Sequence, residues 1–453
     1  MKRIHYIWLI PFVFSILFTQ CEKEPEPEPG PEIKDVNFLN ALIEKGVDTN
    51  GDGQISADEA AAVDLLDVSY RSISDLSGIE LFVNLATFAC SYNLLTSLDI
   101  SANTSLEYLE CSGNQLTSLD VSNISGLKYL YCSSNKLTGL DLSNNIYLID
   151  LDCHENLLSS LDISKNIILN YLYCFSNQLT SLDVSTNNDL STLYCQHNYL
   201  YSLDISNLPD LIQFSCSDNL LTTLDVSNQP RLEYLYCRNN HVGTLDISNN
   251  PKLRRLLVEN NILTTLDVSS QPYLWDLRCS GNQLATLNVS NLLNLQTLHC
   301  ADNQLTTLDV SNNTSLRVMD CGENQLTSLD VSNQDKLGQL NCQSNQLTIL
   351  DLSNNPGLDM LDCSDNQLTT LDVTGMIDLR ALSCSGNQLT TLDLSNNMSL
   401  GLGMGGGTPC FLDIGNMPDL ERVCVWRIPF PPANFTLCAE GSPNVFFTTE
   451  CSK

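Results

Sequence analysis

The sequence predicts a repeat solenoid that is mainly β. Three observations carry this prediction. Cysteine recurs every 21 residues from Cys90 to Cys384, with Val258 in place of one of the fifteen; Asn follows each of these positions by three residues; and apolar and polar residues alternate inside each period. Such alternation is the pattern of a short strand with one buried face. A unit this small cannot bury a core alone, so neighbouring units must stack.

The first 20 residues predict a secretory signal peptide. Lys2 and Arg3 precede an apolar stretch at 7–18 that is too short for a confident membrane span. The stretch resembles a bacterial lipoprotein signal peptide, which implies that Cys21 is the lipidated first residue of the mature chain. A non-lipidated secreted protein and an inner-membrane anchor are the alternatives.

Residues 21–34 are rich in Pro and Glu and are predicted to form an extended acidic tether, because they are too polar to pack. In some Gram-negative surface lipoproteins, an acidic tract just after the cysteine marks export to the outer face. This resemblance implies a lipid anchor in the outer membrane and a position at the cell surface.

Residues 35–65 are predicted to form an EF-hand-like cap that binds one structural Ca²⁺. The segment from Asp48 to Glu59 fits the calcium-loop pattern at every required position and lies between two stretches of helical character. Calcium prefers hard oxygen ligands, here the side chains of Asp48, Asn50, Asp52 and Glu59 and the backbone carbonyl of Gln54. The alternative is an Asx-rich turn that caps the first helix. A single loop of this kind favours a structural clamp over a sensor.

Residues 66–84 predict an irregular capping coil, and residues 85–399 form fifteen repeats without an insertion. In the rung from Leu106 to Gly126, the halves LxxLxC and LxxLDV are near copies. Each rung is therefore predicted to contain two short parallel strands separated by turns, stacked into a rod or shallow arc. The pattern resembles the leucine-rich repeat family, in the 21-residue bacterial class called IRREKO, with internalin-like repeats.

The three regular rows have structural interpretations. The cysteines are predicted to be buried free thiols, because stacked Cβ atoms lie about 4.8 Å apart and no histidine stands at ligand spacing. The asparagines are predicted to bridge backbone groups of adjacent coils. An outward Asp follows each cysteine position by nine residues, with Asn288 as the exception. Hydrogen bonding to nearby hydroxyls with solvation is one explanation of this acidic row, and a cation-binding strip is the other.

The outward positions of the other strand vary, and recognition requires variety. Eight tyrosines line this face in the first half of the solenoid, and a basic cluster follows them. These residues are Tyr108, Tyr129, Tyr131, Tyr171, Tyr173, Tyr194, Tyr234 and Tyr236, then Arg254, Arg255 and Arg278. Tyrosine suits both protein hot spots and sugar stacking, so we interpret the face as ligand-binding. The alternative is that aromatic residues favour exposed strands and pack across them.

Residues 400–453 are predicted to form degenerate coils and a C-terminal cap. Cys410, Cys424, Cys438 and Cys451 lie outside the 21-residue register. In an exported chain they are predicted to form two disulfides, with three pairings possible.

Composition narrows the function. A net charge of −32 argues against nucleic acid or an anionic membrane surface as the main partner. The five histidines are scattered and no nucleophile motif is present, so we expect no enzyme. The internalin-like resemblance implies a surface or secreted protein that mediates protein–protein interaction or adhesion through the tyrosine-rich face. A glycan-binding surface lipoprotein and a structural envelope spacer are the alternatives.

Overall fold

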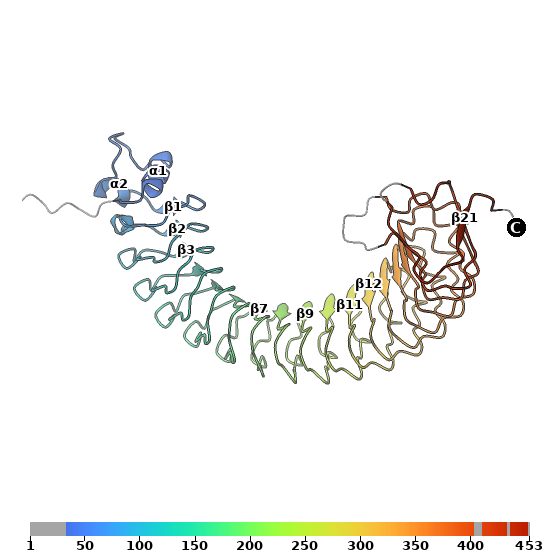
Figure 1. The fold of residues 1–453 in the computed structure, drawn as a ribbon. Coiled ribbons are helices and arrows are strands. Elements are labelled where there is room, and N and C mark those ends of the chain that lie inside the picture. The colour runs from blue at the N-terminus through green and yellow to red at the C-terminus, as the bar shows by residue number, and fades with distance from the viewer. Residues whose placement is uncertain (1–32, 403–409, 433–434, 452–453) are drawn as a thin grey trace, which may run out of the picture.

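The computed structural model describes residues 33–402, 410–432 and 435–451. Over these ranges the chain forms a curved solenoid, with a row of strands along its inner edge and turns along its outer edge (Figure 1). The predicted signal peptide, Cys21 and most of the Pro/Glu tether lie outside the described residues. Within the described ranges, no helix has the length and apolar character that crossing a membrane requires.

Two helices lie at the N-terminal end of the solenoid (Figure 1). Helix α1 spans Val36–Glu44 and helix α2 spans Ala57–Ala61. Asp35 caps α1, because one of its carboxylate oxygens accepts hydrogen bonds from two N–H groups of the first turn. The other oxygen accepts from the N–H of Ser74 at 2.7 Å. Together with the fully buried Phe38, this contact fixes the helical cap to the first coil.

Eighteen parallel strands form the inner, concave sheet. Within the repeats each strand residue pairs with its counterpart 21 residues along the chain, as Tyr108 does with Tyr129. The sheet begins in the predicted capping coil, which also contains the 3-10 helix η1 (Ile79–Leu81). The strands are β1 (Leu65–Asp67), β2 (Thr87–Ala89), β3 (Tyr108–Glu110), β4 (Tyr129–Tyr131), β5 (Asp150–Asp152), β6 (Tyr171–Tyr173), β7 (Thr192–Tyr194), β8 (Gln213–Ser215), β9 (Tyr234–Tyr236), β10 (Arg255–Leu257), β11 (Asp276–Arg278), β12 (Thr297–His299), β13 (Val318–Asp320), β14 (Gln339–Asn341), β15 (Met360–Asp362), β16 (Ala381–Ser383), β18 (Leu412–Asp413) and β20 (Leu437–Cys438).

The prediction of two strands per rung is wrong for most of the solenoid. In the LxxLDV segment, the N–H groups of Leu119, Asp120 and Val121 donate no backbone hydrogen bond to a neighbouring rung. Curvature explains this, because rungs that pair closely on the concave side lie further apart on the convex side. The chain is accordingly a deep arc and not the expected rod or shallow arc (Figure 1).

A second ladder forms near the C-terminal end, where the coils lose the 21-residue register. It joins β17 (Thr391–Leu394), β19 (Arg422–Val425) and β21 (Phe446–Thr448) in parallel. Among the described residues, this short sheet is the one place where both halves of a coil pair with their neighbours.

The core is a stack of leucines and cysteines from successive rungs. Leu106, Leu109 and Leu116 are fully buried, and the fourteen cysteines of the row are buried and free, as predicted. Burial raises the pKa of these thiols, to about 12 for Cys174 and Cys237. Because the thiolate is the reactive form, the row is chemically inert at neutral pH.

A row of buried asparagines joins the rungs beside the strands. This strand-side row comprises the Asn three residues after each cysteine position, from Asn93 to Asn387. In Asn177, Nδ2 donates to the carbonyls of Cys153 and Cys174 at 3.0 and 3.2 Å, and Oδ1 accepts from the N–H of Leu158 at 3.0 Å. These contacts confirm the predicted bridge between adjacent coils.

A second row of buried amides was missed by the sequence analysis. This outer row comprises the residue eight positions before each cysteine position and includes Asn103, Asn145 and Asn166. In Asn166, Nδ2 donates to the carbonyls of Leu142 and Asn145 at 3.3 and 2.8 Å. Its Oδ1 is buried and, among the described residues, has no hydrogen-bond partner.

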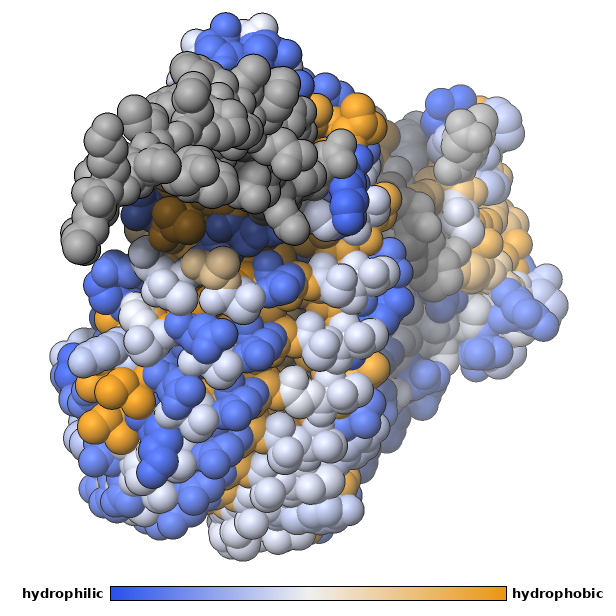
Figure 2. All heavy atoms as spheres, turned by 90° about the vertical axis from the view of Figure 1, so that its left-hand side faces the viewer, coloured by the Kyte–Doolittle hydropathy of each residue, from blue (hydrophilic) through white to orange (hydrophobic). Residues whose placement is uncertain are grey.

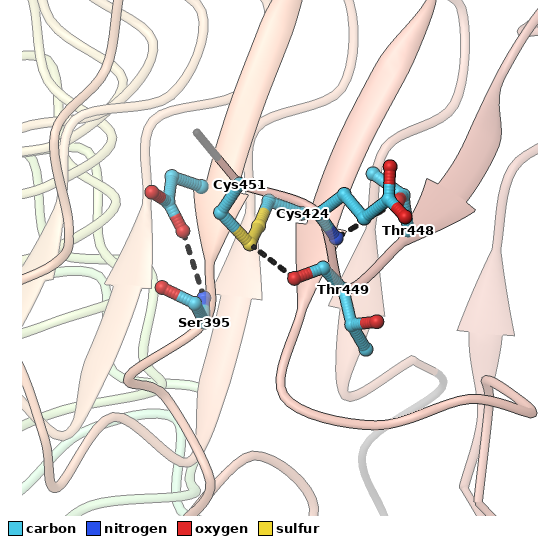
Figure 3. Close-up of a disulfide and its surroundings, with 7 residues drawn as sticks. Ser395, Cys424, Thr448, Thr449 and Cys451 are labelled. Carbon is cyan, nitrogen blue, oxygen red and sulfur yellow. Dashed lines mark hydrogen bonds between the residues drawn. A yellow bond between two sulfur atoms is a disulfide. The ribbon is translucent and has the colours of Figure 1, made fainter. Parts of the chain in front are cut away.

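Two disulfides close the C-terminal cap. The structure joins Cys410 to Cys438 and Cys424 to Cys451, with Cα atoms 5.9 and 5.6 Å apart, which selects one of the three possible pairings. Cys424 lies on β19 and Cys451 follows β21, so this disulfide ties the last coil to the one before it (Figure 3). The Asp393 carboxylate lies near these sulfurs, but sulfurs joined in a disulfide do not act as thiolate ligands for a metal.

Candidate binding surface

Each concave strand directs two side chains toward the inside of the arc. These are the first and third residues of the strand, whereas the middle residue is buried. Because the strands are in register, the outward residues form a first row and a third row along the solenoid. The eight predicted tyrosines lie on β3, β4, β6, β7 and β9 of this sheet. We call them the tyrosine face: Tyr108, Tyr129, Tyr171 and Tyr234 in the first row, and Tyr131, Tyr173, Tyr194 and Tyr236 in the third row.

The tyrosine rings partly pack on one another. Tyr108 and Tyr131 have ring centroids 5.4 Å apart, and Tyr173 and Tyr194 form an edge-to-face pair at 5.4 Å. Such contacts leave the third-row rings half-buried. Tyr171, in the first row, is the most open of the eight at 40% exposed. Tyr129 and Tyr171 therefore provide the accessible aromatic surface, whereas Tyr108, Tyr234 and the third-row rings are partly buried.

Hydrogen bonds and burial fix some rings of the tyrosine face and raise their pKa. The hydroxyls of Tyr108 and Tyr131 donate to the carboxylates of Glu110 and Asp150 at 2.8 and 2.9 Å. Burial raises the pKa of both phenols, and the paired carboxylates raise it further. Burial also raises the pKa of Tyr194 to about 12. At physiological pH these three rings are therefore uncharged.

The basic cluster predicted beside the tyrosines is neutralised by carboxylates. Asp276 is 1% exposed and accepts hydrogen bonds from Arg255 at 2.8 and 3.0 Å and from Arg278 at 3.0 Å. Arg254 pairs with Glu233 at 2.9 Å. A buried carboxylate requires such partners, so the arginines of the predicted basic cluster form an ion-pair network.

A pocket of about 590 Å³ lies on the C-terminal half of the concave sheet, over β12 to β16 and β18, and the sequence analysis missed it. Its first-row side is aliphatic except for Gln339, and its third-row side carries carboxylates. We call it the acidic pocket and define it by Val318, Met360 and Ala381 on one side and Asp320, Asp362 and Asp413 on the other. Among the described residues that line it, none is Lys or Arg. The available sequence signal for this pocket was the run of outward strand residues after the tyrosines, whose side chains are shorter than tyrosine.

The predicted calcium loop forms a compact turn. Asp48 accepts from the N–H groups of Gly51 and Gly53 at 2.7 and 2.9 Å, and the amide of Asn50 donates to Asp52 at 3.1 Å. Gly53 has φ +81°, the left-handed conformation that glycine adopts readily. The oxygen-rich set matches the chemistry that Ca²⁺ prefers.

Glu59, the predicted bidentate ligand, instead closes this loop through hydrogen bonds. Its carboxylate accepts from the N–H and hydroxyl of Ser56 at 2.9 and 2.8 Å and from both groups of Thr49 at 2.8 Å. These bonds, those of Ser56 first, lower the pKa of Glu59 to about 2. In the described ranges, the carboxylates of Asp48, Asp52 and Glu59 do not converge within 4.8 Å of one another. The donor chemistry fits calcium, whereas this arrangement of Glu59 does not, and the calcium site stays a prediction.

The side chains of the acidic row on the convex side lie in turns and accept hydrogen bonds from the backbone two residues further along. Asp183 accepts from the N–H of Ser185 at 2.9 Å, and Asn288 accepts from Ser290 in the same way at 3.0 Å. The hydrogen bonds from Ser185 lower the pKa of Asp183. Figure 2, a view onto the N-terminal end, shows hydrophilic residues over much of the visible surface. Local hydrogen bonding and solvation therefore account for the row without a bound cation.

Comparison with known proteins identifies similar solved structures, while no family model and no curated protein matches the sequence. The functional domain of InlJ from Listeria monocytogenes, described as including a cysteine ladder, is 32% identical; the match covers 87% of this chain and 82% of that one, with a TM-score of 0.67. The LRR protein LIC12759 from Leptospira interrogans is 23% identical over 86% and 97% of the two chains, with a TM-score of 0.61. The plant peptide hormone receptor RGFR1, in complex with RGF2, is 22% identical over 82% and 65%, with a TM-score of 0.70. The last two likenesses concern the fold alone.

Proposed function

Because the chain belongs to the bacterial leucine-rich repeat family that includes InlJ, we propose that it binds a protein ligand on its concave sheet. The observation that carries this proposal is the tyrosine face, eight rings held in register on five of the seven parallel strands from β3 to β9. Rigid aromatic side chains with a polar hydroxyl are the residues that contribute most to protein interfaces.

The proposal extends to the location of the protein. We place it at the cell surface, held in the outer membrane by a lipid on Cys21, and we assign it an adhesive role. The apolar N-terminal segment and the acidic tract support this assignment. External protease added to intact cells should remove the chain, and Cys21→Ala should release it from the membrane fraction. Protection from the protease, with lysed cells as the control, would place it inside the envelope.

The calcium loop is part of the proposal as a structural clamp. Asp48, Asn50, Asp52 and the carbonyl of Gln54 would hold Ca²⁺, and Glu59 would join them only by giving up hydrogen bonds from Thr49 or Ser56. The ion would then fix the loop between the two N-terminal helices. It takes no part in recognition, because the loop belongs to the helical cap and the tyrosine face begins at β3.

The test of the ligand-binding proposal compares three tyrosines on the concave face with three tyrosines outside it. One variant carries Tyr129→Ala, Tyr171→Ala and Tyr234→Ala on the concave face. The control carries Tyr147→Ala, Tyr199→Ala and Tyr201→Ala, which are 54%, 54% and 64% exposed and lie outside the strands. The immobilised chain is used to capture extracellular proteins, and each candidate is then titrated in purified form.

We expect affinity for a genuine ligand to fall at least tenfold in the concave variant and to persist in the control, since a hot-spot ring contributes about 2 kcal/mol or more. Equal binding by both variants would contradict the proposal. Binding confined to a glycan array would favour the glycan-binding alternative, and no binding in either assay would favour a structural spacer.

A further inference from the structure

Among the described residues, the carboxylates of the acidic pocket have no lysine or arginine partner. Asp320 accepts from the N–H of Gly322 at 3.2 Å, and its nearest titratable neighbour is His299 at 3.8 Å. Burial, followed by the charge of Arg278, lowers the pKa of His299, so the imidazole is neutral at physiological pH. The nearby Asp276, by contrast, is matched by two arginines.

The other two carboxylates are held in place by hydroxyl groups. Asp362 accepts from the hydroxyl of Ser364 at 2.6 Å, and Asp413 accepts from the hydroxyl of Ser385 at 3.1 Å. These bonds fix the carboxylates without neutralising them. The pocket therefore presents oriented negative charge on its third-row side, in a chain whose net charge is already −32.

The opposite side of the pocket is mainly aliphatic. Val318, Met360 and Ala381 occupy the first row together with the polar Gln339, and one strand residue separates this row from the carboxylate row. Lysine and arginine have the matching construction, because an aliphatic stem carries a cationic head. A basic side chain laid across the strands would place its stem on the first row and its charge on the third.

We propose that the acidic pocket binds the basic side chains of an extended segment of a protein ligand. This inference rests on the proposed protein-binding function and assigns the C-terminal half of the concave sheet to a lysine- or arginine-containing stretch. Charge complementarity is the basis of the assignment. The pocket itself supplies the apolar contact that an exposed acidic row lacks.

The spacing of the carboxylates defines the segment further. Asp320, Asp362 and Asp413 lie on β13, β15 and β18, which are alternate strands of the sheet, so they recur about every 9.6 Å at the usual strand separation. A polyproline II segment advances about 3.1 Å per residue with three residues per turn, so every third side chain points the same way at about 9.3 Å intervals. Basic residues at every third position match the pocket.

The experiment uses the full chain and synthetic fluorescent peptides. The probe is RPARPARPA, with EPAEPAEPA as the charge control and a peptide with arginine at every second position as the spacing control; anisotropy is measured at 0.15 M salt. The pocket variant carries Asp320→Asn, Asp362→Asn and Asp413→Asn. The matched variant carries Asp162→Asn, Asp183→Asn and Asp204→Asn, which changes the net charge equally on the convex side.

We expect the pocket variant to bind the arginine probe at least tenfold more weakly than the wild type, and the convex variant to bind within twofold of it. Ser383→Arg, which places a cation between Asp362 and Asp413, should abolish binding and covers the case in which the triple variant unfolds. Equal losses in the two triple variants, or no binding of the probe by the wild type, would overturn the inference. Equal affinity for the second-position peptide would overturn the spacing. None of these outcomes touches the tyrosine test, which uses different residues.

Discussion

Two rows of buried amides run along the solenoid, and only one of them never changes. The strand-side row is Asn in all fifteen rungs, whereas the outer row has an apolar residue in place of an amide at Phe82, Ile124, Leu208, Leu292 and Met376. Each strand-side Asn uses both its nitrogen and its oxygen, but every outer-row amide leaves a buried oxygen without a partner among the described residues. An unpartnered buried oxygen costs free energy. A buried amide is therefore present in every rung where both its nitrogen and its oxygen form hydrogen bonds. It is replaced in some rungs where only the nitrogen does.

The largest predicted effect tests this difference directly. Asn177→Leu should lower the free energy of unfolding by about 3 kcal/mol or more, because the N–H of Leu158 loses its partner in a closed core and the carbonyls of Cys153 and Cys174 each lose one of their two amide donors. Asn166→Leu should stay within about 1 kcal/mol of the wild type, as the natural Leu208 and Leu292 indicate. Denaturant unfolding measures both. Equal losses would show that burial alone, and not complete hydrogen bonding, makes the first row invariant.

Calcium binding should have the next largest effect on stability. It extends the comparison to the oxygens of the predicted calcium loop, which could accept an ion as a further partner. Saturating Ca²⁺ should raise the stability of the helical cap by about 2 to 3 kcal/mol if its concentration exceeds the Kd about a hundredfold. Hydrogen exchange should locate this gain in residues 36–61 and leave the middle rungs unchanged. Asp48→Asn with Asp52→Asn should abolish the response. Identical hydrogen exchange in Ca²⁺ and in chelator would contradict the predicted calcium site.

A smaller effect is expected in the convex acidic row, where the acceptor matters more than its charge. Asp372 accepts from the N–H and the hydroxyl of Thr374 at 2.9 and 2.6 Å. Asp372→Ala should lower stability by about 0.5 kcal/mol, whereas Asp372→Asn should leave it unchanged, because the amide oxygen can accept the same N–H bond. Thermal unfolding compares the two. A larger loss for Asn than for Ala would mean that the negative charge is required.

The smallest effect per residue concerns pH, and its sign differs between the two sides of the arc. Hydrogen bonds from Ser185 lower the pKa of Asp183, so its contribution is present above the ordinary pKa near 4 and lost as pH falls through the lower folded value. Burial raises the pKa of Asp150 and Asp320, whose unfavourable contribution is relieved as pH falls. Hydrogen exchange at pH 3 and pH 6 should therefore show weaker protection on the convex side in acid. Uniform change across each rung would contradict the assignment.

The sequence was sufficient for the architecture because one row of residues defines the register. Cysteine at 21-residue steps placed the core, the strand-side asparagines and the tyrosines on their correct faces. The outer amide row was hidden because Ile124 and Leu208 interrupt it. The second strand of each rung was predicted from the alternation of apolar and polar residues in the LxxLDV segment. The curvature of the solenoid moves these segments of neighbouring rungs too far apart to pair.

Contacts between rungs were harder to predict. The pairing of Arg255 with Asp276 joins residues 21 positions apart, so it becomes visible only when neighbouring strands are aligned. The acidic pocket depends on short side chains over several successive rungs, and no single rung signals it. Nor does the repeat signal that Glu155 and Ser176 adopt a positive φ, since glycine occupies the equivalent position at only a few rungs, such as Gly113.

Because the rungs pair residue for residue, positions on the concave sheet are separated by a fixed distance for each 21-residue unit between them. Tyr236 on β9 and Asp320 on β13 are separated by a whole number of strands, and that number is set by the count of 21-residue units between them. Loss or duplication of one unit in the gene would preserve the pairing between neighbouring strands. It would nevertheless move the aromatic half by one strand relative to the acidic half. A partner that contacts both halves would therefore distinguish chains of different length.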